Sequence, residues 1–222
     1  MPSREVEFPC SECPADAGTA RLIGLYDQRQ EGLRMQRVKV HRGELSAAQL
    51  HALACLAHRF TPDFPLHLTT RQDVELHGLR PRDIPDVQRG IAAAGLTCIG
   101  ACGDTLRNVT TCPCNGFVAG TMDVAETADA IRATAEALPF IRDMPRKFKI
   151  SISACDDACA RPWINDLGFV SQQDGTFRDE AILQGVAYDV LGVGQASMGI
   201  AYPTPGAVSG RAVSERGAPA SG

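Results

Sequence analysis

Two successive patterns of apolar and polar residues predict the first folded unit of the chain. Residues 35–40 alternate apolar and polar side chains, as a half-buried strand does. Ser46 followed by Gln49 predicts a capping box that opens a helix running to about Arg59. Residues 66–69 and 74–77 predict two short strands, and a helix then starts at Pro85 and ends at Gly95. This β-α-β-β-α order is typical of a compact α+β unit, like half of a ferredoxin-like arrangement.

A second unit is predicted from about Thr97 onward. Asp123 and Glu126 indicate the start of a helix that runs to about Leu138, where Pro139 ends it. Three segments are strand candidates, of which the first alternates most clearly: residues 148–153, 167–170 and 187–191. We therefore expect an irregular lead-in over residues 1–20, one domain over 21–96, a second over 97–203, and a disordered tail over 204–222 that is rich in Gly, Ala, Ser and Pro.

Composition narrows the classes of function. The chain is 44% hydrophobic and 22% charged, and its net charge is −4, so no global basic field favours nucleic acid. No apolar run reaches the roughly 20 residues that span a bilayer, and the first ten residues have no apolar core of a secretory signal. We expect a cytoplasmic protein that binds neither nucleic acid nor membrane.

Nine cysteines are many for a chain of this length. Their odd number and the expected cytoplasmic location argue against a disulfide framework. The cysteines are therefore expected to be metal or cluster ligands or buried thiols. Cys55 falls in a helical pattern with Leu50, Leu53, Ala54 and Ala57, so we expect it in the core. The spacing of Cys10 and Cys13 is a weak metal or redox signal beside the simpler reading of incidental thiols.

The strongest metal signal is Cys155-x-x-x-Cys159, which follows a predicted strand. Three intervening residues let two thiolates converge on one iron–sulfur or zinc centre. Cys112 and Cys114 are candidates for the other two ligands, although one intervening residue is a tight spacing. Cys98 and Cys102 are the alternative pair.

Cations gather in the same part of the sequence. Lys147 and Lys149 would point to one face of a strand, where two ammonium groups repel unless an anion lies between them. Arginine offers a planar fork for carboxylates and oxyanions, and lysine offers a point charge and a transferable proton. A site for a small oxyanion or a carboxylate-rich cofactor, or else a solvated charged face, fits this set: Arg71, Arg107, Arg146, Lys147 and Lys149.

Several segments resemble the siroheme-dependent nitrite/sulfite reductase family, in the family's order. The resemblance runs from about Gly24 to Val170 and rests on five stretches: residues 24–32 (GLYDQRQEG), 67–72 (HLTTRQ), 103–113 (GDTLRNVTTCP), 144–150 (MPRKFKI) and 165–169 (NDLGF). The fold it implies is a ferredoxin-like half-domain followed by an α/β siroheme-type domain with a mixed sheet.

The resemblance implies roles for individual residues. Arginines in the positions of Arg71 and Arg107 approach siroheme and its ligand, and lysines matching Lys147 and Lys149 bind the oxyanion and supply protons. Gln72, Asn108 and Arg146 belong to the same cofactor-binding stretches. A [4Fe-4S] cluster would be held by Cys112, Cys114, Cys155 and Cys159, with Cys159 joining it to the siroheme iron. The implied reaction is reduction of sulfite or nitrite with electrons from a ferredoxin-type or reductase donor.

The chain departs from the family pattern in two ways. Family enzymes usually contain two such halves and this chain contains one, most like the N-terminal half. The family's first cysteine pair is Cys-x5-Cys, but Val118 stands six residues after Cys112. A non-catalytic half that complements a partner chain or its own two-fold mate is therefore one alternative. A binding module stabilised by zinc or thiols is another.

Overall fold

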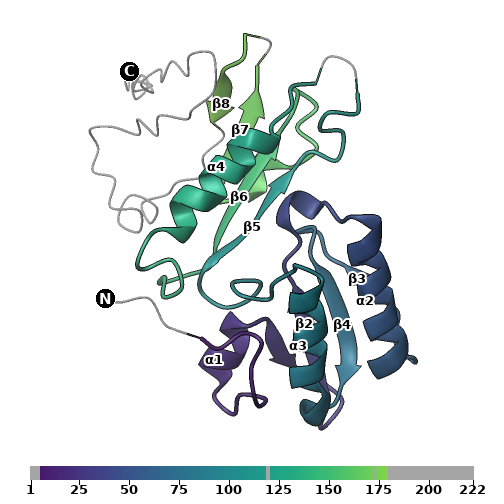
Figure 1. The fold of residues 1–222 in the computed structure, drawn as a ribbon. Helices are drawn as coiled ribbons and strands as arrows, with labels where there is room; N and C mark the ends of the chain where they lie inside the picture. The colour runs from purple at the N-terminus through teal and green to yellow at the C-terminus, as the bar shows by residue number, and fades with distance from the viewer. Residues whose placement is uncertain (1–5, 119–120, 173, 180–222) are drawn as a thin grey trace, which may run out of the picture.

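The computed structural model describes residues 6–118, 121–172 and 174–179, and it contains two β-sheets that lie side by side (Figure 1). One sheet and its helices form the first unit, and a second sheet with one long helix forms the other. The predicted α+β class, with a ferredoxin-like half-domain followed by a mixed sheet, is confirmed.

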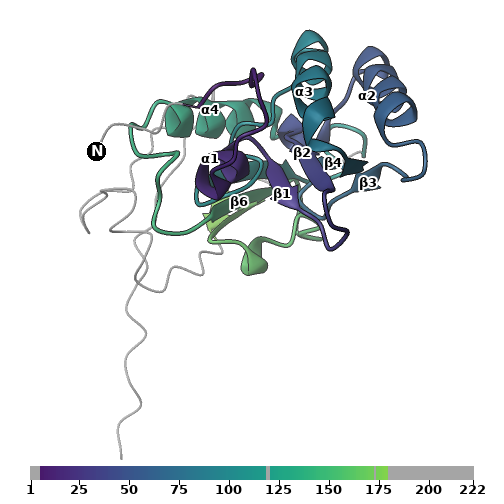
Figure 2. The same cartoon turned by 90° about the horizontal axis from the view of Figure 1, so that it is seen from below.

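The first unit is an antiparallel sheet of order β1-β2-β4-β3. Two helices, α2 and α3, lie on the same face of this sheet (Figure 2). The elements of this unit are α1 Ala17–Leu22, β1 Leu25–Asp27, β2 Arg34–Val38, α2 Ala47–Phe60, β3 His67–Leu68, β4 Val74–Leu79 and α3 Ile84–Ala93, with 3-10 turns at His41–Gly43 and Pro81–Asp83.

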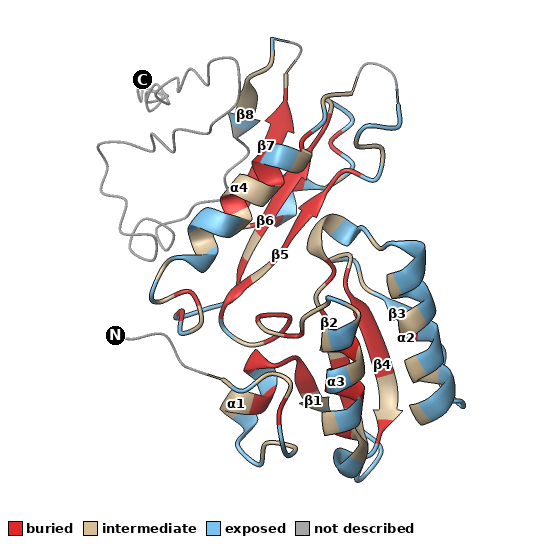
Figure 3. Ribbon diagram, viewed as in Figure 1, coloured by how far each residue is buried: buried red, intermediate tan, exposed pale blue. Residues whose placement is uncertain are grey.

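The helix boundaries follow the predicted signals. The Ser46 hydroxyl accepts the N–H of Gln49, and the Gln49 side chain accepts the N–H of Ser46, so the capping box is formed. Pro85 lies in the first turn of α3, and Gly95 follows its end with φ of 71°. Both helices turn an apolar stripe to the sheet, and their outward sides are exposed (Figure 3).

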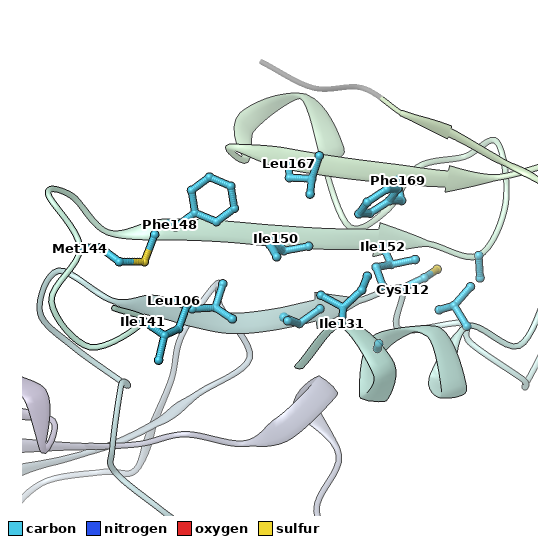
Figure 4. Close-up of a cluster of buried hydrophobic side chains, with 14 residues drawn as sticks. Leu106, Cys112, Ile131, Ile141, Met144, Phe148, Ile150, Ile152, Leu167 and Phe169 are labelled. Atoms are coloured by element: carbon cyan, nitrogen blue, oxygen red, sulfur yellow. The ribbon is translucent and has the colours of Figure 1, made fainter. Parts of the chain in front are cut away.

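The second unit is a sheet of order β5-β6-β7-β8 in which the first three strands are parallel and β8 is antiparallel. Its elements are β5 Leu106–Thr111, α4 Ala125–Glu136, β6 Phe148–Ser153, a 3-10 turn Pro162–Ile164, β7 Leu167–Ser171 and β8 Phe177–Asp179. The helix α4 packs on one face, where Ile131, Ile150, Ile152 and Phe169 form the core (Figure 4).

Several sequence predictions need correction or fall outside the described residues. Residues 1–20 are not all irregular: Asp16 caps α1, and Cys10 is 3% exposed in the first core. Cys55 is exposed rather than buried, because the stripe of α2 runs through Leu53, Leu56 and Phe60 and leaves Leu50 and Ala54 outside. The strand expected at 187–191 and the tail over 204–222 lie outside the described residues.

Within the described residues, no helix has both the length and the apolar character needed to cross a bilayer.

Candidate functional site

Four cysteines meet at the carboxyl edge of the parallel sheet. Cys112 comes directly after β5, and Cys155 and Cys159 follow β6. Because β5 and β6 are parallel neighbours, their carboxyl ends lie at one edge. Partial desolvation raises the pKa of the Cys114 thiol, and the nearby thiols of Cys112 and Cys155 raise it further. Partial desolvation likewise raises the pKa of Cys159, with added contributions from the other three thiols.

The loops at this edge hold the thiols in tight turns. Asn115 N–H bonds Cys112 O at 3.0 Å, and Ala158 N–H bonds Cys155 O at 3.1 Å. Ala158 has φ of 51°, a left-handed conformation that bends the chain between Cys155 and Cys159. A cavity of about 360 Å³ lies beside Cys155, with Met122 and Ser171 among its walls. Pairs of thiols on two adjacent loops suit a multinuclear iron–sulfur centre.

Cations line a separate cavity at the amino edge of the same sheet. This cavity measures about 390 Å³ and contains three residues expected from the sequence: Arg107, Arg146 and Lys147. Arg21 of α1 and Arg142 before β6 also line it, and sequence reasoning missed both. Arg21 lies on α1, a helix that was not predicted, and Arg142 falls outside every motif, so neither carried a signal.

The expected cations differ in how they are held. Arg107 donates from Nε to Gly103 O at 3.1 Å and from Nη1 to Ala101 O at 2.5 Å. Lys149 donates from Nζ to Ile164 O at 3.1 Å and lies 4.0 Å from Asp166. Lys149 therefore has protein partners of its own, and it does not line the cavity that contains Lys147.

Arg71, Gln72 and Asn108 connect the two units instead of lining either cavity. The Arg71 guanidinium donates to Asn165 Oδ1, Asn108 O and Ile150 O, and burial lowers its pKa to about 10. The Gln72 side chain donates to Thr111 O at 2.7 Å and accepts from Thr111 N at 3.0 Å. Asn108 Nδ2 donates back to Val40 O and Arg71 O. The expected cofactor-binding roles of these three residues stay predictions.

The two edges are far apart. The segment from Lys147 to Ser153 is extended, so at about 3.3 Å per residue it spans roughly 20 Å. Arg107 and Lys147 lie before or at the starts of β5 and β6, whereas the cysteines follow the ends of these strands. The cysteines and the cationic cavity therefore cannot both contact one small ligand within a single chain.

His67, Glu75 and His77 form a third polar group, on the strands β3 and β4. Glu75 Oε2 accepts from His67 Nδ1 at 2.9 Å and from His77 Nε2 at 3.0 Å, while its Oε1 accepts from Arg37. The three ligand atoms lie within 4.8 Å of one another, as a metal site would require. The sequence carried a signal for this group. Glu75 and His77 are two apart on one strand and so point to the same face, and a hairpin register that pairs His67 with Glu75 adds the third residue.

Gln28 favours a hydrogen-bonded network over a metal at this group. Its Oε1 accepts the N–H of Gly78 at 2.6 Å, so its Nε2 is the atom that faces His77 Nδ1 at 3.1 Å. His77 Nδ1 then accepts, and the proton lies on Nε2, directed at Glu75. A metal would have to displace that proton and turn over the Gln28 amide.

Two domain models of one protein family match the chain, one for each unit. Residues 26–94 match the nitrite/sulfite reductase ferredoxin-like half domain, and residues 102–200 match the nitrite and sulphite reductase 4Fe-4S domain. The ferredoxin–nitrite reductase of Leptolyngbya laminosa is 35% identical over 65% of this chain and 30% of its own length. The assimilatory ferredoxin-dependent nitrite reductase of Haloferax mediterranei is 35% identical over 67% of this chain and 27% of its own length.

Solved structures agree with these matches. The Mycobacterium tuberculosis NirA protein superposes with a TM-score of 0.61 and 28% identity, over 71% of this chain and 32% of that chain. A dissimilatory sulfite reductase I shares the fold with a TM-score of 0.54 and 14% identity, over 62% of this chain and 32% of its own. The chain spans about 30% of the length of the relatives it matches. It belongs to the nitrite/sulfite reductase family.

Proposed function

We propose that this chain is one half of a siroheme-dependent reductase of nitrite or sulfite. The observation that carries the proposal is the group of four cysteines at one edge of two adjacent parallel strands, inside the segment that matches a 4Fe-4S domain. The family and this domain imply two cofactors, siroheme and a [4Fe-4S] cluster. The residues of this chain fit both groups, although at different edges of the sheet.

The cysteine edge suits the cluster. Cys112, Cys114, Cys155 and Cys159 would be its ligands, since their thiols lie close enough to raise one another's pKa values. Thiolate formation on metal binding would reverse these shifts, because the metal charge stabilises the deprotonated sulfur. Cys159 is exposed and is the thiol best placed to reach a group outside the chain.

The cationic cavity suits the oxyanion and the acidic groups of the macrocycle. Siroheme, when bound, supplies the iron at which the oxyanion is reduced and the route for its electrons. Arg107, Arg146 and Lys147 would hold negative charge there, because several cations around one recess attract an anion more strongly than a single cation does. The ammonium of Lys147 can also donate protons to the oxygen that leaves.

A second half would complete the site. The roughly 20 Å between the two edges means that cysteines of one half and cations of another must face the same cofactor pair. The second half could be another copy of this chain, a different chain, or the remainder of a longer one. Two copies related by a two-fold axis would generate two equivalent sites.

The relatives suggest the substrate and the electron donor. Their names include ferredoxin–nitrite reductases and a sulfite reductase [ferredoxin], so a ferredoxin-type donor and either oxyanion fit. The cations of the cavity suit both anions and do not choose between them. All nine cysteines are free thiols, which fits a reducing cytoplasm.

An absorption spectrum tests the proposal. The protein would be purified without oxygen from cells that make siroheme, and its iron and acid-labile sulfide would be measured. A Soret band, a visible siroheme band and roughly four irons with four sulfides per cluster are expected. Colourless protein without iron would overturn the proposal, and zinc in its place would favour a thiol–zinc module.

Serine variants then test the ligands. Cys155→Ser and Cys159→Ser should each lose most of the sulfide and the cluster absorbance, because serine is a poor ligand for iron–sulfur clusters. Cys55→Ser is the matched control, since Cys55 is exposed on α2 away from this edge. A full cluster in both test variants would refute this ligand set.

A further inference from the structure

Four of the five cations around the cavity at the amino edge have no hydrogen-bond or ion-pair partner in the described part of the chain. Within residues 6–118, 121–172 and 174–179, the side chains of Arg21, Arg142, Arg146 and Lys147 form no hydrogen bond or ion pair. Some arginines elsewhere are neutralised by carboxylates: Arg37 pairs with Glu75 at 2.6 Å, and Arg42 pairs with Glu44 at 2.7 Å. In a chain with net charge −4, four such cations around one recess are a local concentration of positive charge.

The carboxylates of the cavity wall leave a positive surplus. Five cations and two aspartates line the cavity, so its formal charge is 5 − 2 = +3. Asp104 is already used by the backbone, because its Oδ1 accepts the N–H of Lys147 at 3.2 Å. Arg107 is bonded to carbonyl oxygens, which orient the guanidinium without cancelling its charge. The cavity therefore calls for a ligand with several negative groups.

The size and walls of the cavity indicate more than a small inorganic anion. Its volume of about 390 Å³ is that of a site for an organic ligand. Leu22 and Met144 contribute apolar surface. The centre of the Tyr26 ring lies 5.9 Å from the Arg21 guanidinium and 6.0 Å from that of Arg37. Tyr26 thus helps to hold Arg21 at the wall of the cavity.

We propose that Arg21 and Arg142, together with Arg146 and Lys147, bind the carboxylate side chains of a tetrapyrrole. The proposal rests on the proposed function and adds two residues outside the family motifs to the cofactor site. Guanidinium groups on two separate segments, α1 and the loop before β6, can each bind one carboxylate in a bidentate fork. A ring with an acidic group on every edge would use both.

Titration of the full chain, without cofactor, with iron-free uroporphyrin tests this inference. Uroporphyrin carries an acetate and a propionate on every pyrrole, and its fluorescence anisotropy reports binding. Arg21→Gln and Arg142→Gln should each weaken binding on the order of tenfold and reduce its dependence on salt. Coproporphyrin, which has methyl groups in place of the acetates, should bind more weakly than uroporphyrin.

Arg29→Gln is the matched control. Arg29 is exposed, belongs to the same unit and does not line the cavity, so its loss should leave the affinity within about twofold of the unmodified chain. Equal affinities in the Arg21, Arg142 and Arg29 variants would overturn the inference, and so would equal binding of the two porphyrins. The titration needs no iron, so its result is independent of whether a cluster or siroheme spectrum is found.

Discussion

Asp73 is the single residue with the clearest expected pH dependence. It is 2% exposed and accepts the N–H of Val40 at 3.2 Å, and burial raises the pKa of its carboxyl to about 6, although Lys39, Arg37 and Arg71 oppose the shift. Burial also lowers the pKa of the neighbouring Lys39, so both shifts favour the uncharged forms. The unfolded carboxyl titrates near 3.8, so its contribution to stability is full below that pH and is lost as the pH rises through about 6.

Asp73→Asn removes this titration. As the pH rises from 4 to 7, the unmodified chain should lose up to about 3 kcal/mol in free energy of unfolding relative to the variant. Each pKa unit of the shift is worth about 1.4 kcal/mol. Urea denaturation of both proteins at several pH values in that range measures the difference. A difference that stays constant with pH would show that Asp73 titrates as it does in the unfolded chain.

Gln72 is a second residue whose replacement should change the stability of the chain. Its side chain satisfies both the N–H and the C=O of Thr111, so Gln72→Ala should leave two backbone groups at the junction of the units without partners. We expect a loss of about 2–3 kcal/mol in free energy of unfolding. Gln30→Ala is the control, because Gln30 is exposed and its side chain makes no hydrogen bond in the described part of the chain. Equal stability of the two variants would contradict the role of Gln72 as a connector.

At the scale of elements, the close packing of β7 on the preceding 3-10 turn depends on Gly168. A Cβ on Gly168 would lie 2.5 Å from Pro162 O, so alanine there would push away the 3-10 turn that follows the cysteine loop. Gly168→Ala should cost about 3 kcal/mol of stability, at the upper end of the usual range for overpacking, because the clash involves backbone atoms. In contrast, a Cβ on Gly90 of α3 meets the mobile end of Leu56 at 2.6 Å, and alanine is the better helix former, so Gly90→Ala should be close to neutral. Thermal melting of both variants compares them directly.

The elements also show what the sequence could predict. Strand β6 was predicted at its observed bounds because its side chains alternate cleanly, and α2 was found from its capping box. Strand β5 was not predicted, because its register shifts between Leu106 and Val109 and four of its six residues are polar. The helix α1 has only six residues, which is too short for a helical pattern of apolar residues to be recognised in the sequence.

The candidate site was only partly predictable for a related reason. Short motifs identify residue types, so the cysteine pairs and the cations of residues 144–150 could be selected from sequence. Their separation into two edges depends on β5 and β6 being parallel, which no local pattern reveals. The unpaired state of Arg21 and Arg142 depends on which carboxylates lie near them in space.

At the scale of the whole molecule, the separated edges predict complementation between copies. A chain with Cys159→Ser lacks the cysteine edge but keeps its cations, and a chain with Arg146→Gln and Lys147→Gln has the reverse defect. If two copies form the site, each preparation alone should be inactive. An equal mixture, unfolded and refolded together with the cofactors, should recover roughly a quarter of the unmodified nitrite or sulfite reduction.

That fraction follows from the symmetry of a two-fold dimer. Half of the randomly paired dimers contain one chain of each kind, and each of these has one intact site and one site with both defects. Sedimentation of the unmodified chain should accordingly show a dimer, and reductant-driven oxyanion loss measures the recovered activity. A monomer, together with an inactive mixture, would exclude a second copy as the complement and point to a different chain as the source of the missing edge.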